Sequence, residues 1–117
     1  MIQRNTIASS VSLSGVGLHL GERCTLTFRP APTGQGIVFR RTDLEGQPEI
    51  PAQVTQVTAS ERRTQIGTGN AAIHTIEHVL SAVAALDIDD LIIEMDAPEP
   101  PILDGSAEPF YAALITA

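Results

Sequence analysis

The sequence predicts an α+β fold in which two helices pack on one face of a mixed β-sheet. Strand patterns fill the first part of the chain, helix patterns occupy 75–86 and 106–114, and a short apolar run at 91–93 separates these helices. Strands followed by helix, strand and helix are typical of a sheet with helices on one face. A chain of 117 residues is long enough for one core, so we expect 1–117 to form a single domain.

The clearest strand lies around Cys24, Leu26 and Phe28, which alternate with polar or charged residues. This period of two is expected of a half-buried strand, and it places Cys24 on the inward face as a small core residue. Residues 7–13 alternate more loosely and predict an earlier strand. The segment 15–21 between them is too rich in glycine for a strand interior.

Proline and glycine predict a turn at 30–36, and the next strand follows at 37–41. Residues 43–51 are predicted to form a loop. Two weaker strands and a hairpin turn are predicted further along the chain, at 54–58, 64–67 and 68–70.

The first helix is predicted to begin at Thr75, a favourable N-cap, and to end at 87–90. The apolar run at 91–93 is consistent with a strand buried on both faces. After a Pro-rich loop, Ser106 is expected to cap the second helix, whose apolar face includes Phe110 and Leu114. The core stripe of the first helix has helical spacing and consists of Ile76, Val79, Leu80, Val83 and Leu86.

Composition excludes several classes of function. A formal net charge of −7 and 3% aromatic residues argue against nucleic-acid binding. No apolar run approaches the ~20 residues of a membrane span, and the N-terminus lacks the apolar stretch of a signal peptide, so we expect a cytoplasmic protein. The single Cys24 agrees with a reducing compartment. The arginine pairs at 40–41 and 62–63 could meet a diphosphate, although solvated strand ends explain them more simply.

Glu77 and His78 carry the sharpest chemical signal. They lie in the first turn of the predicted helix, about 100° apart around its axis. That arrangement suits a histidine bound to a metal and a carboxylate that takes a proton from the metal's water. Ala82 and Ala85 follow His78 on its own face and leave room beside it. From these residues alone, the simpler interpretation is favoured: a glutamate that suits the helix dipole beside an ordinary histidine.

Three further residues each have a functional interpretation and a simpler structural one. His74 and His78 complete an H-x-x-E-H pattern, the zinc motif of one protease class, but a cap at Thr75 would place His74 before the helix. His19 ends GVGLH, whose glycines allow close approach to a ligand or simply form a tight strand connection. Asp104 precedes a helix N-terminus, where it could hold an anion, position a partner side chain or form an ordinary turn.

Five motifs, taken together, resemble a known family. GVGLH, LTFRPAP followed by GIVFRRTD, TIEHVLSA, LDIDDLIIE and PILDGSAEPF occur in the order and spacing of the bacterial UDP-3-O-acyl-N-acetylglucosamine deacetylases. These enzymes use zinc to remove the acetyl group during lipid A biosynthesis. The resemblance covers about residues 5–115 and implies one half of a two-domain sandwich, with the helices of two similar α+β halves packed between their sheets.

The resemblance also implies roles for individual residues. Glu77 matches the general base and His78 the one zinc ligand contributed by the first half. His19 and Asp104 match supporting positions close to the active site, whereas His74 matches no family role. The implied cofactor is Zn²⁺ and the implied substrate is UDP-3-O-acyl-N-acetylglucosamine.

A catalytic zinc site normally has three protein ligands, and the family takes the other two from its C-terminal domain. We therefore expect the isolated chain to bind zinc weakly or not at all, and to lack activity without that domain. Helix faces left uncovered would favour self-association. The alternative is a non-catalytic α+β module that folds alone or binds a partner. Retention of Glu77 and His78 favours the deacetylase.

Overall fold

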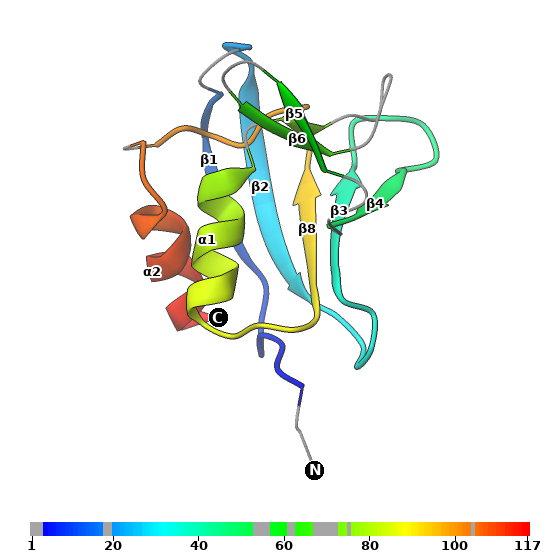
Figure 1. Cartoon of the computed structure of the whole chain (residues 1–117), viewed down its shortest axis with the longest axis vertical. Helices are drawn as coiled ribbons and strands as arrows, with labels where there is room; N and C mark the ends of the chain where they lie inside the picture. Colours follow the sequence, from blue (N-terminus) through cyan, green and yellow to red (C-terminus); the bar gives the residue numbers. More distant parts are fainter. Residues whose placement is uncertain are drawn as a thin grey trace.

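A computed structural model describes residues 4–17, 20–52, 57–60, 63–66, 73–74, 76–103 and 105–117. It confirms the α+β prediction: both helices cover one face of a mixed sheet (Figure 1). The elements in chain order are β1 (Val11–Val16), β2 (Arg23–Pro30), β3 (Ile37–Arg41), β4 (Glu49–Pro51), β5 (Val57–Ser60), β6 (Arg63–Ile66), β7 (Ile73–His74), α1 (Glu77–Ala85), β8 (Leu91–Met95) and α2 (Glu108–Thr116).

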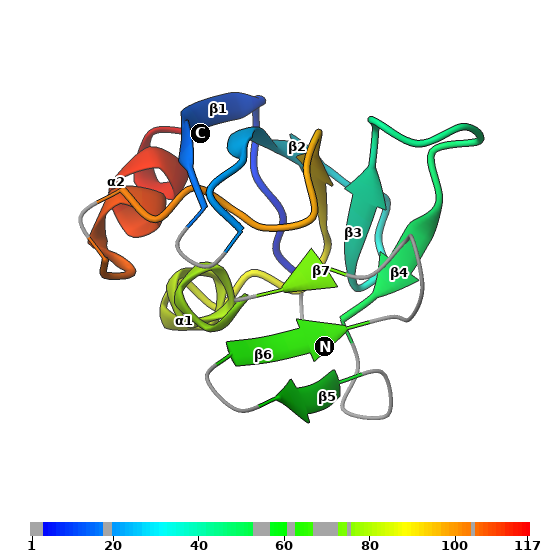
Figure 2. The same cartoon turned by 90° about the horizontal axis from the view of Figure 1, so that it is seen from above.

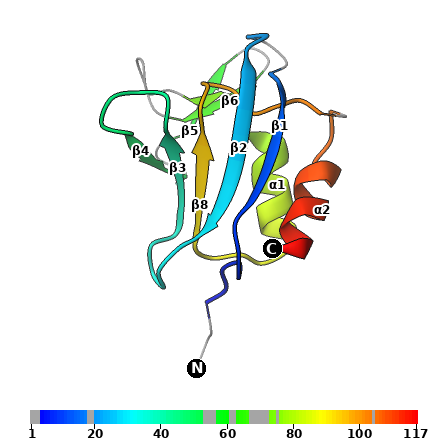
Figure 3. The ribbon, with the colours of Figure 1, turned by 180° about the vertical axis from the view of Figure 1, so that it is seen from behind.

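The main sheet has the strand order β1-β2-β8-β3-β4. All neighbouring strands are antiparallel except β3 and β8, which run parallel. A small antiparallel sheet, β5-β6-β7, precedes α1 in the chain. Figure 2 shows α1 and α2 side by side on the same side of the main sheet, and Figure 3 shows the opposite face, which no helix covers.

The inward face of the main sheet forms the core. Cys24, Leu26 and Phe28 of β2 are fully buried, as their alternation predicts. The ring of Phe28 meets that of Phe110 of α2 edge to face, with centroids 6.5 Å apart. Such a pair adds about 0.5–1.5 kcal/mol beyond the area it buries. The contact packs α2 on the β1–β2 side of the sheet.

The prediction that the strand at 91–93 is buried on both faces is wrong. Leu91, Ile93 and Met95 are buried, whereas Ile92 and Glu94 are only half-buried on the uncovered face. That face is polar, because ion pairs join neighbouring strands across it. Arg40 contacts Glu94 at 2.9 Å and Glu49 at 2.6 Å, and Arg29 also pairs with Glu94.

The prediction that both Arg40 and Arg41 lie in solvent at a strand end is wrong for Arg41. Arg40 lies on the uncovered face, but only 3% of Arg41 is exposed. The Arg41 guanidinium binds the carboxylate of Asp43 two residues later, with Nη2 and Oδ2 2.7 Å apart. Both arginines are therefore engaged within the chain. Residues 61–62, which include the first arginine of the other pair, lie outside the described ranges.

Several predicted boundaries differ from the structure. Strand β1 extends through Gly15 and Val16, which the sequence placed in a glycine-rich connection. The predicted loop 43–51 contains β4, a short edge strand where Pro51 costs no ladder hydrogen bond. Strand β5 lies at 57–60, later than the predicted 54–58, and the predicted turn at 68–70 lies outside the described residues.

Helix α1 begins at Glu77, with Ile76 rather than Thr75 in the N-cap position. The Leu80 N–H donates to the Ile76 carbonyl at 3.0 Å, which closes the first helical turn, and no side chain caps this end. Leu80 itself is only half-buried. The buried residues of this stretch are Ile76, Val79, Ala82 and Val83.

A helix capped by Ser106 would begin at Ala107, but helix α2 begins one residue later, at Glu108. Ala107 occupies the N-cap position, yet the Glu108 N–H still donates to Ser106 Oγ at 3.2 Å. Phe110 and Leu114 are buried as predicted. Neither helix among the described residues is long and apolar enough to cross a bilayer.

A buried carboxylate joins three segments at the end of the sheet where β8 begins. The side chain of Asp90 accepts hydrogen bonds from Arg4, with Nη2 and Oδ1 2.8 Å apart, and from the backbone N–H groups of Gly34 and Gly36. The Arg4 guanidinium, helped by these N–H groups, lowers the pKa of the Asp90 carboxyl to about 2.

We predict that this group makes folding stability depend on pH in acid. Because its folded pKa lies below the unfolded value of about 4, its contribution is complete above pH ~4 and is lost as the pH falls towards 2. Asp90→Asn should unfold at a lower temperature at pH 6, and its stability should vary less between pH 4 and 2. Thermal unfolding across this range measures both. Parallel curves for the two proteins would contradict the prediction.

Candidate metal and catalytic site

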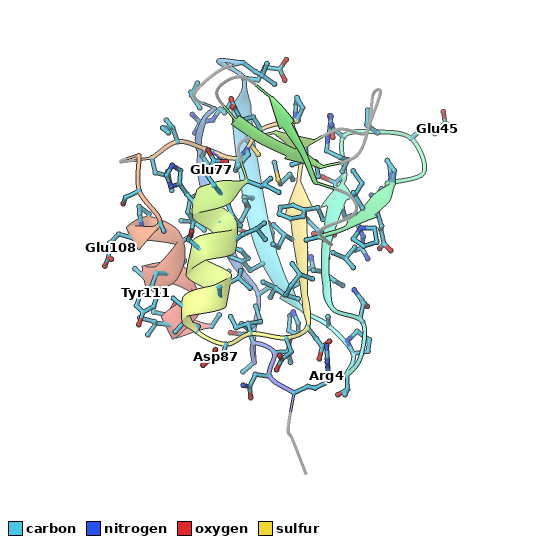
Figure 4. All side chains as sticks on the ribbon, in the orientation of Figure 1. Arg4, Glu45, Glu77, Asp87, Glu108 and Tyr111 are labelled. Atoms are coloured by element: carbon cyan, nitrogen blue, oxygen red, sulfur yellow. The ribbon has the colours of Figure 1, made fainter. Side chains whose placement is uncertain are left out.

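Described parts of three segments that carry candidate residues reach one end of the molecule. The N-terminus of α1, the connection between β1 and β2, and the segment that follows β8 all reach this end (Figure 1). Glu77 lies here, whereas Arg4 lies at the opposite end of the sheet (Figure 4). The fold thus brings together segments that lie far apart in the sequence.

Glu77 is the first residue of α1 and is half-buried. Its Oε2 atom is buried and accepts no hydrogen bond from the residues that the structure describes. A buried carboxylate oxygen without a donor is costly, and native structures rarely contain one without a reason. Although the first N–H groups of a helix are potential donors, none of the described ones donates to Oε2. The atom is available to a proton donor or a cation.

His78 follows in the same helical turn and is also half-buried. Its helix face does not have the room that the sequence predicted. Ala82, one turn further, is 1% exposed and belongs to the core, whereas Ala85 is exposed. His78 therefore lies at the border between the buried and exposed faces of α1. A ligand to a metal at the surface of this domain would occupy such a position.

The protease interpretation of H-x-x-E-H fails on the fold. His74 belongs to β7, where its backbone pairs with Gln65 of β6, so His74 and His78 do not lie on one helix. That motif requires two histidines on the same helical face. The structure thus confirms that His74 precedes the helix.

The two predicted supporting residues, His19 and Asp104, lie outside the described residues. Their neighbours in the chain are described. Leu20 and Leu103 belong to the two connections that reach the end of the molecule where Glu77 lies (Figure 1).

The described residues hold no group of three or more His, Cys, Asp or Glu side chains placed to bind a metal. Cys24 is buried in the sheet, and burial, together with the charge of Asp96, raises the pKa of its thiol to about 12. The thiol is fully buried in the core, and it forms no group of three potential ligands with other described residues. Within the ranges described, His78 is the candidate ligand beside Glu77.

Glu99 is a residue that the sequence analysis missed. It lies between Pro98 and Pro100 after β8, and only 1% of it is exposed. The available signal was a single charged residue in the otherwise apolar run 97–103. Its Oε1 accepts a hydrogen bond from the N–H of Leu20, 3.0 Å away in the β1–β2 connection.

Comparison with known proteins assigns the chain to a family. The model of the UDP-3-O-acyl N-acetylglycosamine deacetylase family, LpxC, matches residues 4–117. The chain belongs to this family. It is 49% identical to a bifunctional enzyme LpxC/FabZ of Chlorobaculum tepidum over all of its own length and 25% of that protein. It is 47% identical to UDP-3-O-acyl-N-acetylglucosamine deacetylases of Bdellovibrio bacteriovorus and Myxococcus xanthus, covering 98% and 97% of its own length.

Family membership confirms the resemblance drawn from the five motifs. The chain spans 38% and 36% of the two LpxC relatives named as deacetylases. Most of each of those two proteins therefore lies outside the part that matches this chain. The LpxC motifs GVGLH, TIEHVLSA and PILDGSAEPF fall in the three segments that meet at the Glu77 end of the fold.

Proposed function

We propose that the protein carrying this chain is a zinc-dependent deacetylase of UDP-3-O-acyl-N-acetylglucosamine in lipid A biosynthesis. In this proposal the chain supplies the general base, Glu77, and one zinc ligand, His78. The observation that carries it is the pair itself. The two side chains share the first turn of α1, and the buried Oε2 of Glu77 accepts no hydrogen bond from the described residues. Membership of the LpxC family supports the reaction and the substrate.

The residues present fit a zinc ion in part. Imidazole nitrogen is a preferred zinc ligand, and a catalytic site uses three protein ligands with one open position. His78 would be one of them, and the others would come from outside the described residues. When bound, zinc polarises a carbonyl and lets water lose a proton near neutral pH.

Glu77 would accept the proton of the water that attacks the acetamide carbonyl. Its buried Oε2 is held at the start of a helix, so the base is positioned before the substrate binds. The attack breaks the carbon–nitrogen bond and yields acetate and the free amine, which needs a proton from an acid. His19 and Asp104 would support the substrate or the reacting groups.

We also propose that residues 1–117 form one domain whose helix side meets a further domain or a second copy of the chain. Ile115 of α2 is 57% exposed. Beside it lies a hollow of about 350 Å³ between the C-terminal ends of both helices and the N-terminal segment. Leu86, Ile88 and Leu114 line the same hollow, so several apolar side chains lie together here, and an apolar patch of this kind favours association.

Acetate release tests the proposed reaction. The protein expressed from the complete gene should release acetate from UDP-3-O-acyl-N-acetylglucosamine, lose this activity after chelation and regain it with added zinc. The alternative, a non-catalytic α+β module, predicts no acetate release with any metal. If the folded, zinc-loaded protein releases no acetate, the proposed deacetylase function is wrong and the non-catalytic module is favoured.

A further inference from the structure

We propose that Glu99 is a positioning residue. Its buried carboxylate fixes the β1–β2 connection, which carries His19, against the segment after β8, which carries Asp104. The inference rests on the proposed function, because His19 and Asp104 are its supporting residues. Glu99 itself is 1% exposed and would touch no substrate.

Glu99 holds the β1–β2 connection on both sides of His19. On one side, Oε1 accepts the N–H of Leu20 at 3.0 Å. On the other, Gly17 packs directly on the side chain. A Cβ at position 17 would collide with Glu99 Oε1 and lie 3.1 Å from Glu99 Cβ. A side chain at 17 would therefore force the Glu99 side chain to shift from its present position.

Backbone hydrogen bonds join the described residues of this connection. The Gly17 N–H donates to the Glu22 carbonyl at 3.0 Å, and the Gly21 N–H donates to the Gly17 carbonyl at 3.2 Å. Gly21 has a φ of +67°, which a residue with a side chain rarely adopts. These bonds join the two ends of the connection. The bond from Leu20 to Glu99 ties it to the segment after β8.

The same two segments meet again next to this contact. The Ile102 N–H donates to the Val16 carbonyl at 2.8 Å. A Cβ on Gly15 would lie 2.9 Å from Pro101 Cβ and 3.2 Å from Leu103 Cδ2, so Gly15 permits the close approach. This explains a glycine inside β1. The contacts run continuously along 15–17 on one segment and 99–103 on the other.

The backbone of Leu103, the residue before Asp104 in the chain, has an unusual conformation. Leu103 has a φ of +53°, in the left-handed region that a leucine seldom occupies, and the Gly105 N–H donates to the Ile102 carbonyl at 2.8 Å. Strain of this kind persists when the surrounding structure determines it. Here the contacts with β1 do so.

A carboxylate suits this task better than an apolar side chain. An ionised group removed from water is costly unless hydrogen bonds compensate it. Apolar packing would hold the segments together without fixing their orientation, whereas a hydrogen bond to a backbone N–H is directional. The buried carboxylate therefore fixes the direction of the Leu20 N–H relative to the segment after β8.

Two variants test the proposal in the protein from the complete gene. Glu99→Ala should lower kcat/KM by ~10- to 100-fold with zinc content unchanged, because a misplacement of about 1 Å can cost that much. The backbone amide of Leu20 should lose its protection from hydrogen exchange. Glu99→Gln retains an oxygen that can accept the Leu20 N–H, so it should restore most of the activity and the protection.

The double variant His19→Ala/Glu99→Ala separates positioning from a loss of stability. If Glu99 acts through His19, the double variant should be no less active than His19→Ala alone. Asp90→Asn is the matched control: it alters a buried carboxylate at the opposite end and should lower stability with kcat/KM unchanged.

Three results would overturn the inference: wild-type kcat/KM in a folded Glu99→Ala protein, additive losses in the double variant, or undiminished protection of the Leu20 amide. If Glu99→Ala does not fold, the inference requires Glu99→Gln to be folded, active and protected, and failure there overturns it as well. A wild-type protein that releases no acetate would refute the proposed function alone. The exchange of Leu20 would still decide whether Glu99 holds the connection.

Discussion

Replacing Glu77 by glutamine should lower kcat for acetate release by ~100- to 10,000-fold while zinc stays bound. The amide retains the size of the side chain and its place at the start of α1, but it cannot accept a proton from water. Because Glu77 is proposed as a base and not as a ligand, zinc content should match that of the wild type. Steady-state acetate release and metal analysis of the same preparation measure both quantities.

Glu108→Gln provides a matched control for this variant. Glu108 is likewise the first residue of its helix, but its side chain is exposed. Figure 4 shows Glu77 on α1 and Glu108 on α2. Removing its charge affects the helix dipole in the same way. The control should retain wild-type kcat. An unchanged kcat in Glu77→Gln would exclude Glu77 as the base.

Replacing His78 by alanine should weaken zinc binding by at least ~100-fold. Loss of a partner that only orients a metal ligand typically costs 10- to 100-fold in affinity, and loss of the ligand itself should cost more. Acetate release should fall with zinc occupancy and should recover only in part at high zinc concentration. Competition with a chromogenic chelator measures the affinity.

His74→Ala is the matched control, because His74 lies four residues earlier in strand β7. It should bind zinc as tightly as the wild type. If zinc is lost in His74→Ala and retained in His78→Ala, the zinc ligand is His74, and the proposed role of His78 is wrong.

The features that the sequence predicted well are those set by local periodicity. Residues of β2 alternate because one face of the strand contacts the core, so Cys24, Leu26 and Phe28 could be assigned to the interior from spacing alone. The helix carrying Glu77 and His78 could be placed within two residues by the same reasoning. Boundaries were harder, since Ile76 occupies the N-cap position without any side-chain cap to mark it.

The features that the sequence did not reveal depend on contacts between distant segments. Asp90 is buried and binds Arg4, 86 positions earlier, and no local pattern indicates that pairing. The side chain of Glu99 is buried and accepts the N–H of Leu20, 79 positions earlier. The roles of Glu77 and His78 came from the family resemblance, since the residues alone favour an ordinary helix start.

Zinc titration of the ¹⁵N-labelled protein from the complete gene tests the central claim most directly, through the imidazole nitrogen resonances of its histidines. Stoichiometric zinc should shift the resonances of His78 and leave those of His74 unchanged. Glu77→Gln should show the same shift of His78 and have lost acetate release. A zinc-loaded protein that releases acetate while the His78 resonances do not move would contradict the proposed site.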